Sequence, residues 1–514
     1  MKKLSFIMLA ALVALFTSCD QKGGPSADTK AKYTVILYAN GGENLDHFIE
    51  EDIAYAAEFL NTKGNDYSVR MVVYMKYSTQ KGLDKQRYTP GGLAGEVYSY
   101  EVGYDCYRER TQKDQYLALP MEWIIDNSDA PMYEPSYISS VLKDAAKNAP
   151  AENYILVIAG HANGWCVEED GEYPAPNKVQ KAAMTDVYYN KRAIKAKELA
   201  AGIRQSGVNV STIVFDCCLQ NNIEYLSELT DVPGLKYTLG SGHTTHGGDY
   251  SDLLKELFKT TAGQQDLTAA LGNYAETYAK QHKTDYEEFH DIVLMNVDFA
   301  VVDLAKLKDT WTPIKNIVDY LCANYKSADS TKYVIPSHNC YQYYNKDCKY
   351  DLLDYLTLME NAGAPFENDA QYETLRLAVD DALHACILKH AYSLNYVDPS
   401  AKPKDAAEKF VTMSINLGAK GRLQDIFDTN GENYFTCYDY EGKPWHFYPS
   451  GATTWKTGDE QLSPEYNWTH SYDKSTFDQK TGWTRWLKLN PVMPYNNPPH
   501  GDDGDTDGED DEEE

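Results

Sequence analysis

Basic residues, cysteines and long apolar segments are all scarce in this sequence. It has 48 Lys and Arg against 77 Asp and Glu, and the net charge of −29 argues against nucleic acid or an anionic membrane surface as a partner. Ten cysteines in 514 residues do not indicate a small disulfide-stapled fold, because a chain of this length buries a core without staples. Beyond residue 16, no segment is apolar over the length that a membrane-spanning helix needs.

The N-terminus predicts export. Residues 1–18 have a charged start and an apolar run over 4–16, which is typical of a cleaved signal peptide. Small residues and then Cys19 follow, and this order resembles the lipobox of bacterial lipoproteins. The resemblance implies lipidation of Cys19 and a polar tether over 19–31; an ordinary cleaved signal peptide is the alternative. We therefore expect an exported bacterial envelope protein, periplasmic or on the cell surface, whose only membrane contact is a lipid anchor.

The C-terminus is strongly acidic. Residues 502–514 hold ten Asp or Glu and no basic residue. The segment lacks the full ligand spacing and the closing glutamate of a calcium-binding loop. We expect a solvated, disordered tail over 496–514.

Strand and helix signals alternate over residues 32–265, which is typical of the α/β class, with a largely parallel sheet covered on both faces. The apolar runs at 153–159 and 212–215 do not alternate with polar residues, as expected of central strands buried on both faces. We expect strands at 33–38, 69–77, 154–159, 212–215 and 236–240, and helices at 50–60, 135–148, 193–204, 220–229 and 251–260.

The pattern changes after residue 265, and we expect a mixed α+β region over 266–495 that packs on the first domain. Segments 83–130 and 166–185 are polar and are interpreted as insertions. Helical signals lie at 267–281, 302–324, 351–361 and 370–391, and strand signals near 408–417 and 433–448.

Two strand ends carry reactive side chains. His161 follows the strand at 154–159, and Cys218 follows the strand at 212–215. Because open parallel sheets build their sites at the carboxyl ends of strands, this pair predicts a nucleophile and a proton-transfer partner for cysteine-dependent acyl transfer. Asp216 lies on the same strand face as Cys218.

Backbone groups near this pair are expected to assist the reaction. A helix from residue 220 would place Cys218 at its N-terminus, where the partial positive charge stabilises a thiolate. The N–H groups of Ala162 and Cys218 are candidates for an oxyanion hole. Cys217 is expected to point into the core.

Both motifs resemble those of a known family. The segment 150–165, which contains His161-Ala-Asn-Gly-Trp, resembles the histidine motif of clostripain-like cysteine peptidases, and Phe215-Asp-Cys-Cys-Leu resembles their cysteine motif. The strand from Tyr33 and the segment 472–487 are similar to the family's first strand and C-terminal part. The resemblance implies a caspase-like α/β/α fold and an endopeptidase that forms an acyl-enzyme on Cys218.

The resemblance also implies a substrate class. Such enzymes typically cleave proteins or peptides after Arg or Lys and use acidic residues to bind that side chain. Asp216 matches one of these acids and Asp249 is the candidate for a second, while a structural carboxylate is the alternative for Asp216. No cofactor or metal ligand is implied; calcium assists some members, but no calcium site can be mapped here. Some members mature by a cut between the histidine and the cysteine, for which the candidate positions are Lys178, Lys181, Lys191 and Arg192; ordinary surface side chains are the alternative.

Departures from the family pattern keep two alternatives open. Ala162 stands where the family has glycine, and the loop 241–250 lacks the usual Ser-Glu start. These departures are compatible with a catalytically impaired surface lipoprotein that binds peptides or glycans. His243 and His246 are spaced like metal ligands, which raises a zinc hydrolase as a further alternative, although no third ligand is evident.

Overall fold

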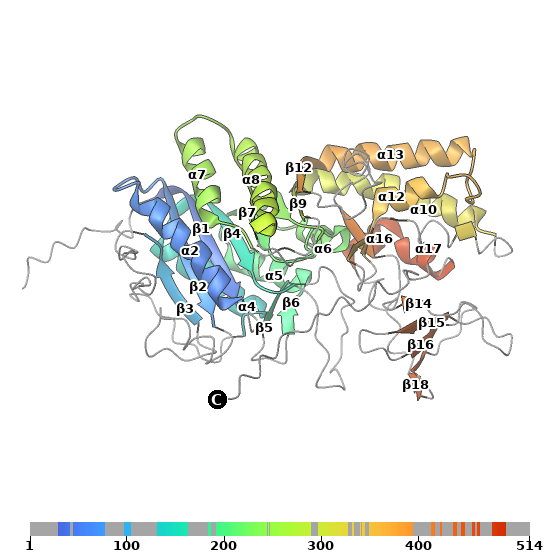
Figure 1. The fold of residues 1–514 in the computed structure, drawn as a ribbon, viewed down its shortest axis with the longest axis horizontal. Coiled ribbons are helices and arrows are strands. Elements are labelled where there is room, and N and C mark those ends of the chain that lie inside the picture. Colours follow the sequence, from blue (N-terminus) through green and yellow to red (C-terminus); the bar gives the residue numbers. More distant parts are fainter. Residues whose placement is uncertain are drawn as a thin grey trace, which may run out of the picture.

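An eight-stranded mixed sheet forms the centre of the protein, in the order β12-β9-β8-β7-β4-β1-β2-β3 (Figure 1). The structure is a computed structural model. It describes residues 29–41, 45–77, 97–103, 131–162, 183–186, 192–243, 245, 247–288, 297–326, 332–333, 340, 342–344, 349–393, 413–416, 422–423, 435–438, 444–447, 455–457, 460–462 and 475–489.

Five adjacent strands of this sheet are parallel, as the sequence predicts. They are β1 (Ala31–Asn40), β2 (Val69–Lys76), β4 (Ala151–Ala159), β7 (Val210–Asp216) and β8 (Tyr237–Gly240). Each of the other three strands is antiparallel to the neighbour through which it joins the sheet: β3 (Val97–Glu101), β9 (Val297–Asp303) and β12 (Ile387–Ser393). The mostly parallel sheet is therefore confirmed.

Helices cover both faces of the sheet and complete the predicted α/β/α sandwich. Successive strand residues point to opposite faces, so Ile36 and Tyr38 join one core while Val35 and Leu37 join the other. The first core is shared with α4 (Pro135–Asn148), α5 (Ala196–Ser206) and α6 (Ile223–Leu229). The second is shared with α2 (Asp46–Asn61), α7 (Tyr250–Thr261) and α8 (Leu267–Glu288).

A second group of helices gathers at one end of the sheet, on the right in Figure 1. Trp483 and Trp486 are fully buried there, and the Trp486 indole donates to the Tyr355 hydroxyl at 3.0 Å. The group consists of α9 (Leu304–Leu307), a 3₁₀ turn (Lys308–Thr310), α10 (Trp311–Asn324), α12 (Leu352–Leu358), α13 (Ala370–Cys386), α16 (Thr476–Thr481) and α17 (Trp483–Leu489). Glu228 of α6 accepts the Thr476 N–H at 2.6 Å and its hydroxyl at 2.7 Å, which fastens α16 to the central domain.

Among the described residues, three small antiparallel sheets accompany the main one. One is the hairpin of β5 (Ala183–Asp186) and β6 (Arg192–Ile194). The second contains β10 (Gln342–Tyr344), β11 (Lys349–Asp351) and β13 (Ser414–Asn416). The third contains β14 (Arg422–Leu423), β15 (Phe435–Tyr438), β16 (Pro444–Phe447), β17 (Trp455–Thr457) and β18 (Glu460–Leu462).

Two helix predictions were wrong at one end. The segment predicted as a helix from residue 302 is still in strand β9 until Asp303, and the helix predicted over 370–391 ends at Cys386, where β12 begins. In both cases pairing with the sheet overrides a helical pattern in the adjoining residues. Because β9 and β12 belong to the main sheet, the sheet continues past the boundary that we placed at residue 265. Strand β3 likewise lies inside the segment interpreted as an insertion over 83–130.

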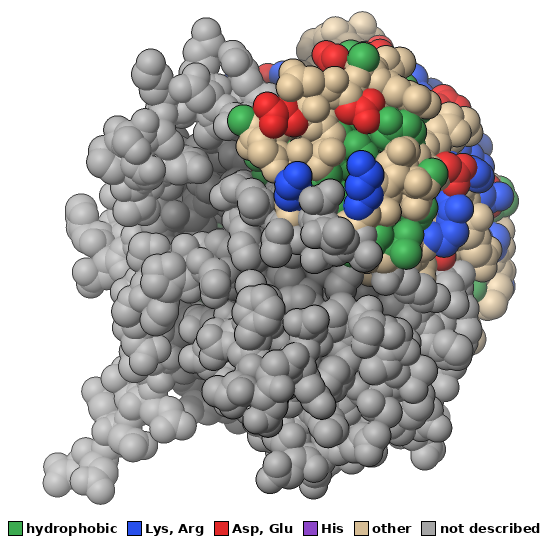
Figure 2. All heavy atoms as spheres, turned by 90° about the vertical axis from the view of Figure 1, so that its right-hand side faces the viewer, with side chains coloured by type: hydrophobic (Ala, Val, Ile, Leu, Met, Phe, Trp, Pro, Cys, Tyr) green, Lys and Arg blue, Asp and Glu red, His purple; other side chains and the backbone are tan. Residues whose placement is uncertain are grey.

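The described surface of the helical end carries charges of both signs side by side (Figure 2). Asp319 pairs with Lys315 at 2.5 Å and also contacts Arg485. Such exposed pairs contribute little to stability, about 0–1 kcal/mol each. Within the described part of the chain, no helix combines the length and the apolar character that crossing a membrane requires.

Candidate active site

The strand register places His161 and Cys218 at neighbouring strand ends. Ala159 of β4 is the register partner of Asp216 of β7, and His161 and Cys218 each follow two residues later. The Gly160 N–H donates to the Asp216 carbonyl at 3.4 Å, so the segments that follow the two strands remain paired beyond the last ladder position. Both residues thus lie at the same edge of the sheet, after strands about 4.8 Å apart.

Gly160 is required by the conformation of the chain before the histidine. Its φ is +142°, and a Cβ at this position would lie 2.5 Å from the carbonyl oxygen of Asn40, at the end of β1. The chain therefore passes against β1 where any other residue would collide. Ala162 is not among the described non-glycine residues with positive φ, so the alanine in place of the family's glycine introduces no such strain.

A tight turn, and not a helix N-terminus, holds the cysteine. The helix that we predicted from residue 220 begins at Ile223, with Asn222 as its N-cap. Leu219, before this helix, has a left-handed φ of +61°, and its N–H donates to the His243 carbonyl at 2.9 Å. Because a helix dipole acts mainly within its first turn, α6 does not explain a stabilised thiolate at Cys218.

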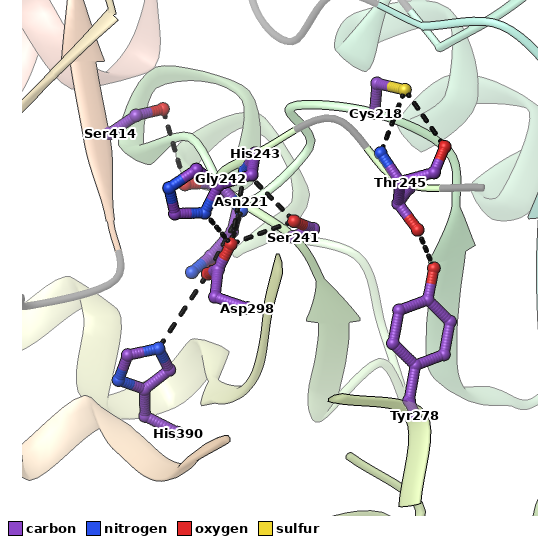
Figure 3. Close-up of polar contacts among 10 residues, drawn as sticks. All are labelled: Cys218, Asn221, Ser241, Gly242, His243, Thr245, Tyr278, Asp298, His390 and Ser414. Atoms are coloured by element: carbon purple, nitrogen blue, oxygen red, sulfur yellow. Dashed lines mark hydrogen bonds and ion pairs between the residues drawn. The ribbon is translucent and has the colours of Figure 1, made fainter. Parts of the chain in front are cut away.

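The Cys218 sulfur instead contacts the loop after β8, which is shown in Figure 3. The Thr245 N–H donates to Sγ at 3.3 Å, and the thiol lies 3.4 Å from the Thr245 carbonyl oxygen, to which it donates. The backbone N–H on sulfur favours the thiolate, whereas the bond from the thiol to the carbonyl oxygen favours the neutral form. Cys218 is partly exposed, whereas Cys217 is buried in the core as predicted, and burial raises the pKa of the Cys217 thiol.

Asp216 is a buried carboxylate with one oxygen unused. The Tyr250 hydroxyl donates to Oδ2 at 2.7 Å, while Oδ1 accepts no hydrogen bond from any residue that the structure describes. Burial raises the pKa of Asp216 to about 7, against the opposing effect of the Tyr250 hydrogen bond. An unpaired buried charge is costly, so this oxygen indicates a place for a hydrogen-bond donor or a cation.

Sequence reasoning missed a second acid near Asp216. A Cβ on Gly247 would lie 3.3 Å from Oδ2 of Asp52, on α2, and 3.8 Å from both carboxylate oxygens of Asp216. Gly247 has a φ of +101°, so it supplies both the backbone conformation and the open space between the two acids. The distance in sequence between α2 and β7 left no local pattern that could have revealed this arrangement.

Asp249, the predicted second acid, has a structural role. It is the N-cap of α7, and its side chain accepts the Ser251 N–H at 2.7 Å. Burial raises the pKa of Asp249 as well. Its part in substrate binding stays a prediction.

Several predicted positions lie outside the described residues: Cys19, Lys178, Lys181, Lys191, His246 and the tail over 496–514. Arg192 is described, as the first residue of β6. The imidazole of His243 binds Asp298 through Nδ1. Among the described residues, no group of three or more His, Cys, Asp or Glu is arranged to hold a metal ion.

A histidine and a cysteine at adjacent strand ends of a caspase-like sandwich define the class of cysteine peptidases, which act on peptides or proteins. The sequence profile of the Clostripain family matches residues 37–488, and the chain belongs to this family. A comparison with curated proteins finds no match.

Solved structures confirm the fold at low sequence identity. A secreted C11 cysteine protease from Bacteroides thetaiotaomicron, called iotapain, has a TM-score of 0.52 and 17% identity, over 76% of this chain and 94% of that one. A secreted C11 protease of the same organism, in complex with an irreversible peptide inhibitor, has a TM-score of 0.52 and 14% identity over 88% and 99%. An inactive zymogen from Parabacteroides distasonis has a TM-score of 0.50 and 14% identity over 88% and 99%.

Proposed function

We propose that this peptidase cleaves after Arg or Lys, with Cys218 as nucleophile and His161 as its proton-transfer partner. The observation that supports the specificity is the unused Oδ1 of buried Asp216, two residues before the cysteine. A guanidinium or ammonium group placed there would satisfy that oxygen and make the ionised carboxylate favourable.

The segment that follows β8 connects the cysteine to this carboxylate. Thr245 contacts the Cys218 sulfur, whereas Gly247 and Tyr250 lie against Asp216. Consider a substrate whose scissile carbonyl carbon reaches Sγ. The side chain of the residue that carries this carbonyl can extend along the same segment towards Asp216. Asp52, across Gly247, adds a second negative charge to attract a cation.

The proposed reaction follows from these positions. The Cys218 thiolate attacks the carbonyl carbon, and the N–H groups of Ala162 and Cys218 stabilise the oxyanion that forms. The His161 imidazolium protonates the leaving amine, and the neutral imidazole then removes a proton from the water that hydrolyses the thioester.

The specificity can be measured with matched peptides that differ only in the residue before the scissile bond. We expect kcat/KM to be at least ~100-fold higher for Arg or Lys than for Gln or citrulline, because the neutral residues leave the buried carboxylate unpaired. Citrulline is the matched control, since it keeps the shape of arginine without its charge. Equal rates for the four peptides would show that no cation-binding pocket exists.

We also propose that the chain is exported and anchored by a lipid on Cys19. The lipobox-like sequence supports the anchor, and two structural neighbours are described as secreted proteases. We expect the native protein to partition with membranes or detergent and Cys19→Ser to appear in the soluble fraction after export. Membrane association of the serine variant equal to that of the native chain would exclude this anchor.

A further inference from the structure

A buried carboxylate on β9 organises the loop after β8. Asp298 is 1% exposed and accepts hydrogen bonds from the Ser241 hydroxyl at 2.9 Å and the Gly242 N–H at 3.0 Å (Figure 3). Its Oδ1 also lies 2.5 Å from Nδ1 of His243 and 3.2 Å from the His243 N–H. One side chain therefore binds polar groups of three consecutive residues: the Ser241 hydroxyl, the Gly242 N–H, and both the N–H and the imidazole of His243.

Two of these residues also bind the turn that carries the cysteine. The His243 carbonyl accepts the Leu219 N–H at 2.9 Å, and the Ser241 carbonyl accepts the Asn221 N–H at 2.9 Å. The first of these bonds is made by the residue with left-handed φ that directly follows Cys218. Two residues after His243, Thr245 makes the hydrogen bonds to sulfur. The loop thus binds both the backbone that follows the cysteine and the cysteine sulfur.

Asp298 is equipped to remain ionised in this position. Burial by itself would raise the pKa of Asp298, but the His243 imidazole and the hydrogen bonds outweigh it and lower the pKa below its usual value. The imidazole of His390, on β12, has Nε2 3.9 Å from Oδ2 of Asp298. Burial lowers the pKa of His390 to about 4, so this imidazole is neutral near pH 7.

The far side of the cysteine turn rests on the C-terminal region. Ser414 of β13 donates its N–H to the Asn221 carbonyl at 3.0 Å, and the Asn222 side-chain amide donates to the Ser414 carbonyl at 3.3 Å. The turn is held between Ser414 on one side and the loop bound to Asp298 on the other. Displacement of that loop would therefore change the position of Thr245 relative to the sulfur, while Ser414 keeps the rest of the turn in place.

We propose that Asp298 and His243 are positioning residues for the Cys218 sulfur. Their contact fixes the loop 241–245, which places both the N–H and the carbonyl oxygen of Thr245 at Sγ. The carbonyl oxygen binds only the neutral thiol, whereas the N–H remains a hydrogen-bond donor to the sulfur after the thiol proton is lost. The proposal rests on Cys218 being the nucleophile. Neither side chain is assigned contact with the substrate, so their loss should lower reactivity of the sulfur without altering the pocket at Asp216.

The test measures the alkylation rate of Cys218 by iodoacetamide as a function of pH, with the modified residue identified by mass spectrometry. In Asp298→Asn and His243→Leu we expect the pH midpoint of alkylation to rise by about one unit, which corresponds to an approximately tenfold lower rate at pH 7. In peptide hydrolysis, kcat should fall while KM stays within about twofold.

Two further variants separate positioning from general destabilisation. Glu101 forms a different ion pair, at 2.7 Å, with the fully buried Arg70 at the opposite end of the sheet. Glu101→Gln breaks this pair and should leave the alkylation midpoint unchanged. His243→Asn retains an N–H donor near the position of Nδ1 and should restore much of the rate lost in His243→Leu. Ser241→Ala is a milder change at the same carboxylate and should give a smaller shift of the midpoint. It replaces Asp298→Asn in the test if that variant does not fold.

An unchanged midpoint in folded Asp298→Asn and Ser241→Ala would overturn the proposal, as would an equal shift in Glu101→Gln. The alkylation assay needs no substrate, so it separates this proposal from the proposed function. A shifted midpoint in a protein without peptidase activity would support the positioning role and contradict only the catalytic one.

Discussion

Cys218→Ala is expected to lower kcat for an Arg or Lys substrate by about 10⁴-fold or more and to leave the thermal unfolding transition nearly unchanged. The side chain is partly exposed, and its sulfur makes two weak hydrogen bonds with Thr245, so little packing is lost. The variant is measured with a chromogenic ester and an amide, since both need the same thioester intermediate.

Cys217→Ala is the matched control for this result. Cys217 is the adjacent residue, is buried in the core and has a raised thiol pKa, so it cannot replace Cys218 as a nucleophile. Its loss should reduce stability by about 1 kcal/mol and leave turnover largely intact. If Cys218→Ala retained turnover, the assignment of the nucleophile would be wrong. If the native protein showed neither turnover nor selective alkylation of Cys218, the impaired binding protein would be the better description.

Asp216→Asn is expected to lower kcat/KM for Arg and Lys substrates by about 10³-fold, with little effect on a citrulline substrate. The substitution keeps the shape and the hydrogen bond with Tyr250 but removes the charge that a cationic side chain would meet. Parallel assays on the two substrates in one enzyme preparation measure the effect. Equal losses on both would show that Asp216 supports the fold of the site and does not select the substrate.

The pH dependence of the native enzyme provides an independent measurement. Because burial raises the pKa of Asp216 to about 7, the carboxyl is mostly protonated below that pH and cannot attract a cation. The ratio of kcat/KM for Arg over citrulline should therefore rise through pH 7 in the native enzyme. The ratio should be flat in Asp216→Asn, whose amide does not titrate.

The raised pKa of Asp216 also makes folding stability depend on pH: stability falls as pH rises, whereas the selectivity for Arg increases. A carboxyl whose pKa is higher in the folded than in the unfolded state stabilises the fold when protonated, and this contribution is lost as pH rises from about 4 to about 7. The difference amounts to on the order of 4 kcal/mol. Asp216→Asn should thus unfold at higher urea concentration than the native protein at pH 8, and the advantage should shrink towards pH 4.

The central strands could be predicted from the sequence because their apolar runs are long and continuous, as in 153–159 and 212–215. The placement of His161 and Cys218 at strand ends followed from the same runs. Strands β9 and β12 were not predicted, since each adjoins a helix with a stronger pattern and is formed only by pairing with the sheet. The start of α6 was misplaced because a left-handed leucine is rare and leaves no sequence signal.

Among the acids around the site, only those close in sequence to the motif residues were predicted. Asp216 lies two residues from Cys218 and was predicted from strand alternation and from the family resemblance. Asp298 is 55 residues from His243, and Asp52 lies on α2, so only the folded sheet brings either one to the site. Asp249 fits its position in sequence as a helix cap, and that use of its side chain was not anticipated.

The dependence of the cysteine turn on Ser414 has a consequence for the order of events in biosynthesis. Asn222 and its partner Ser414 are 192 residues apart, so the ribosome must add most of the remaining polypeptide before the turn acquires its support. A chain that has not yet been synthesised as far as Ser414 therefore contains the Cys218 thiol without this support of the turn. The turn is therefore expected to reach its final arrangement only after Ser414 has been made and has folded against it.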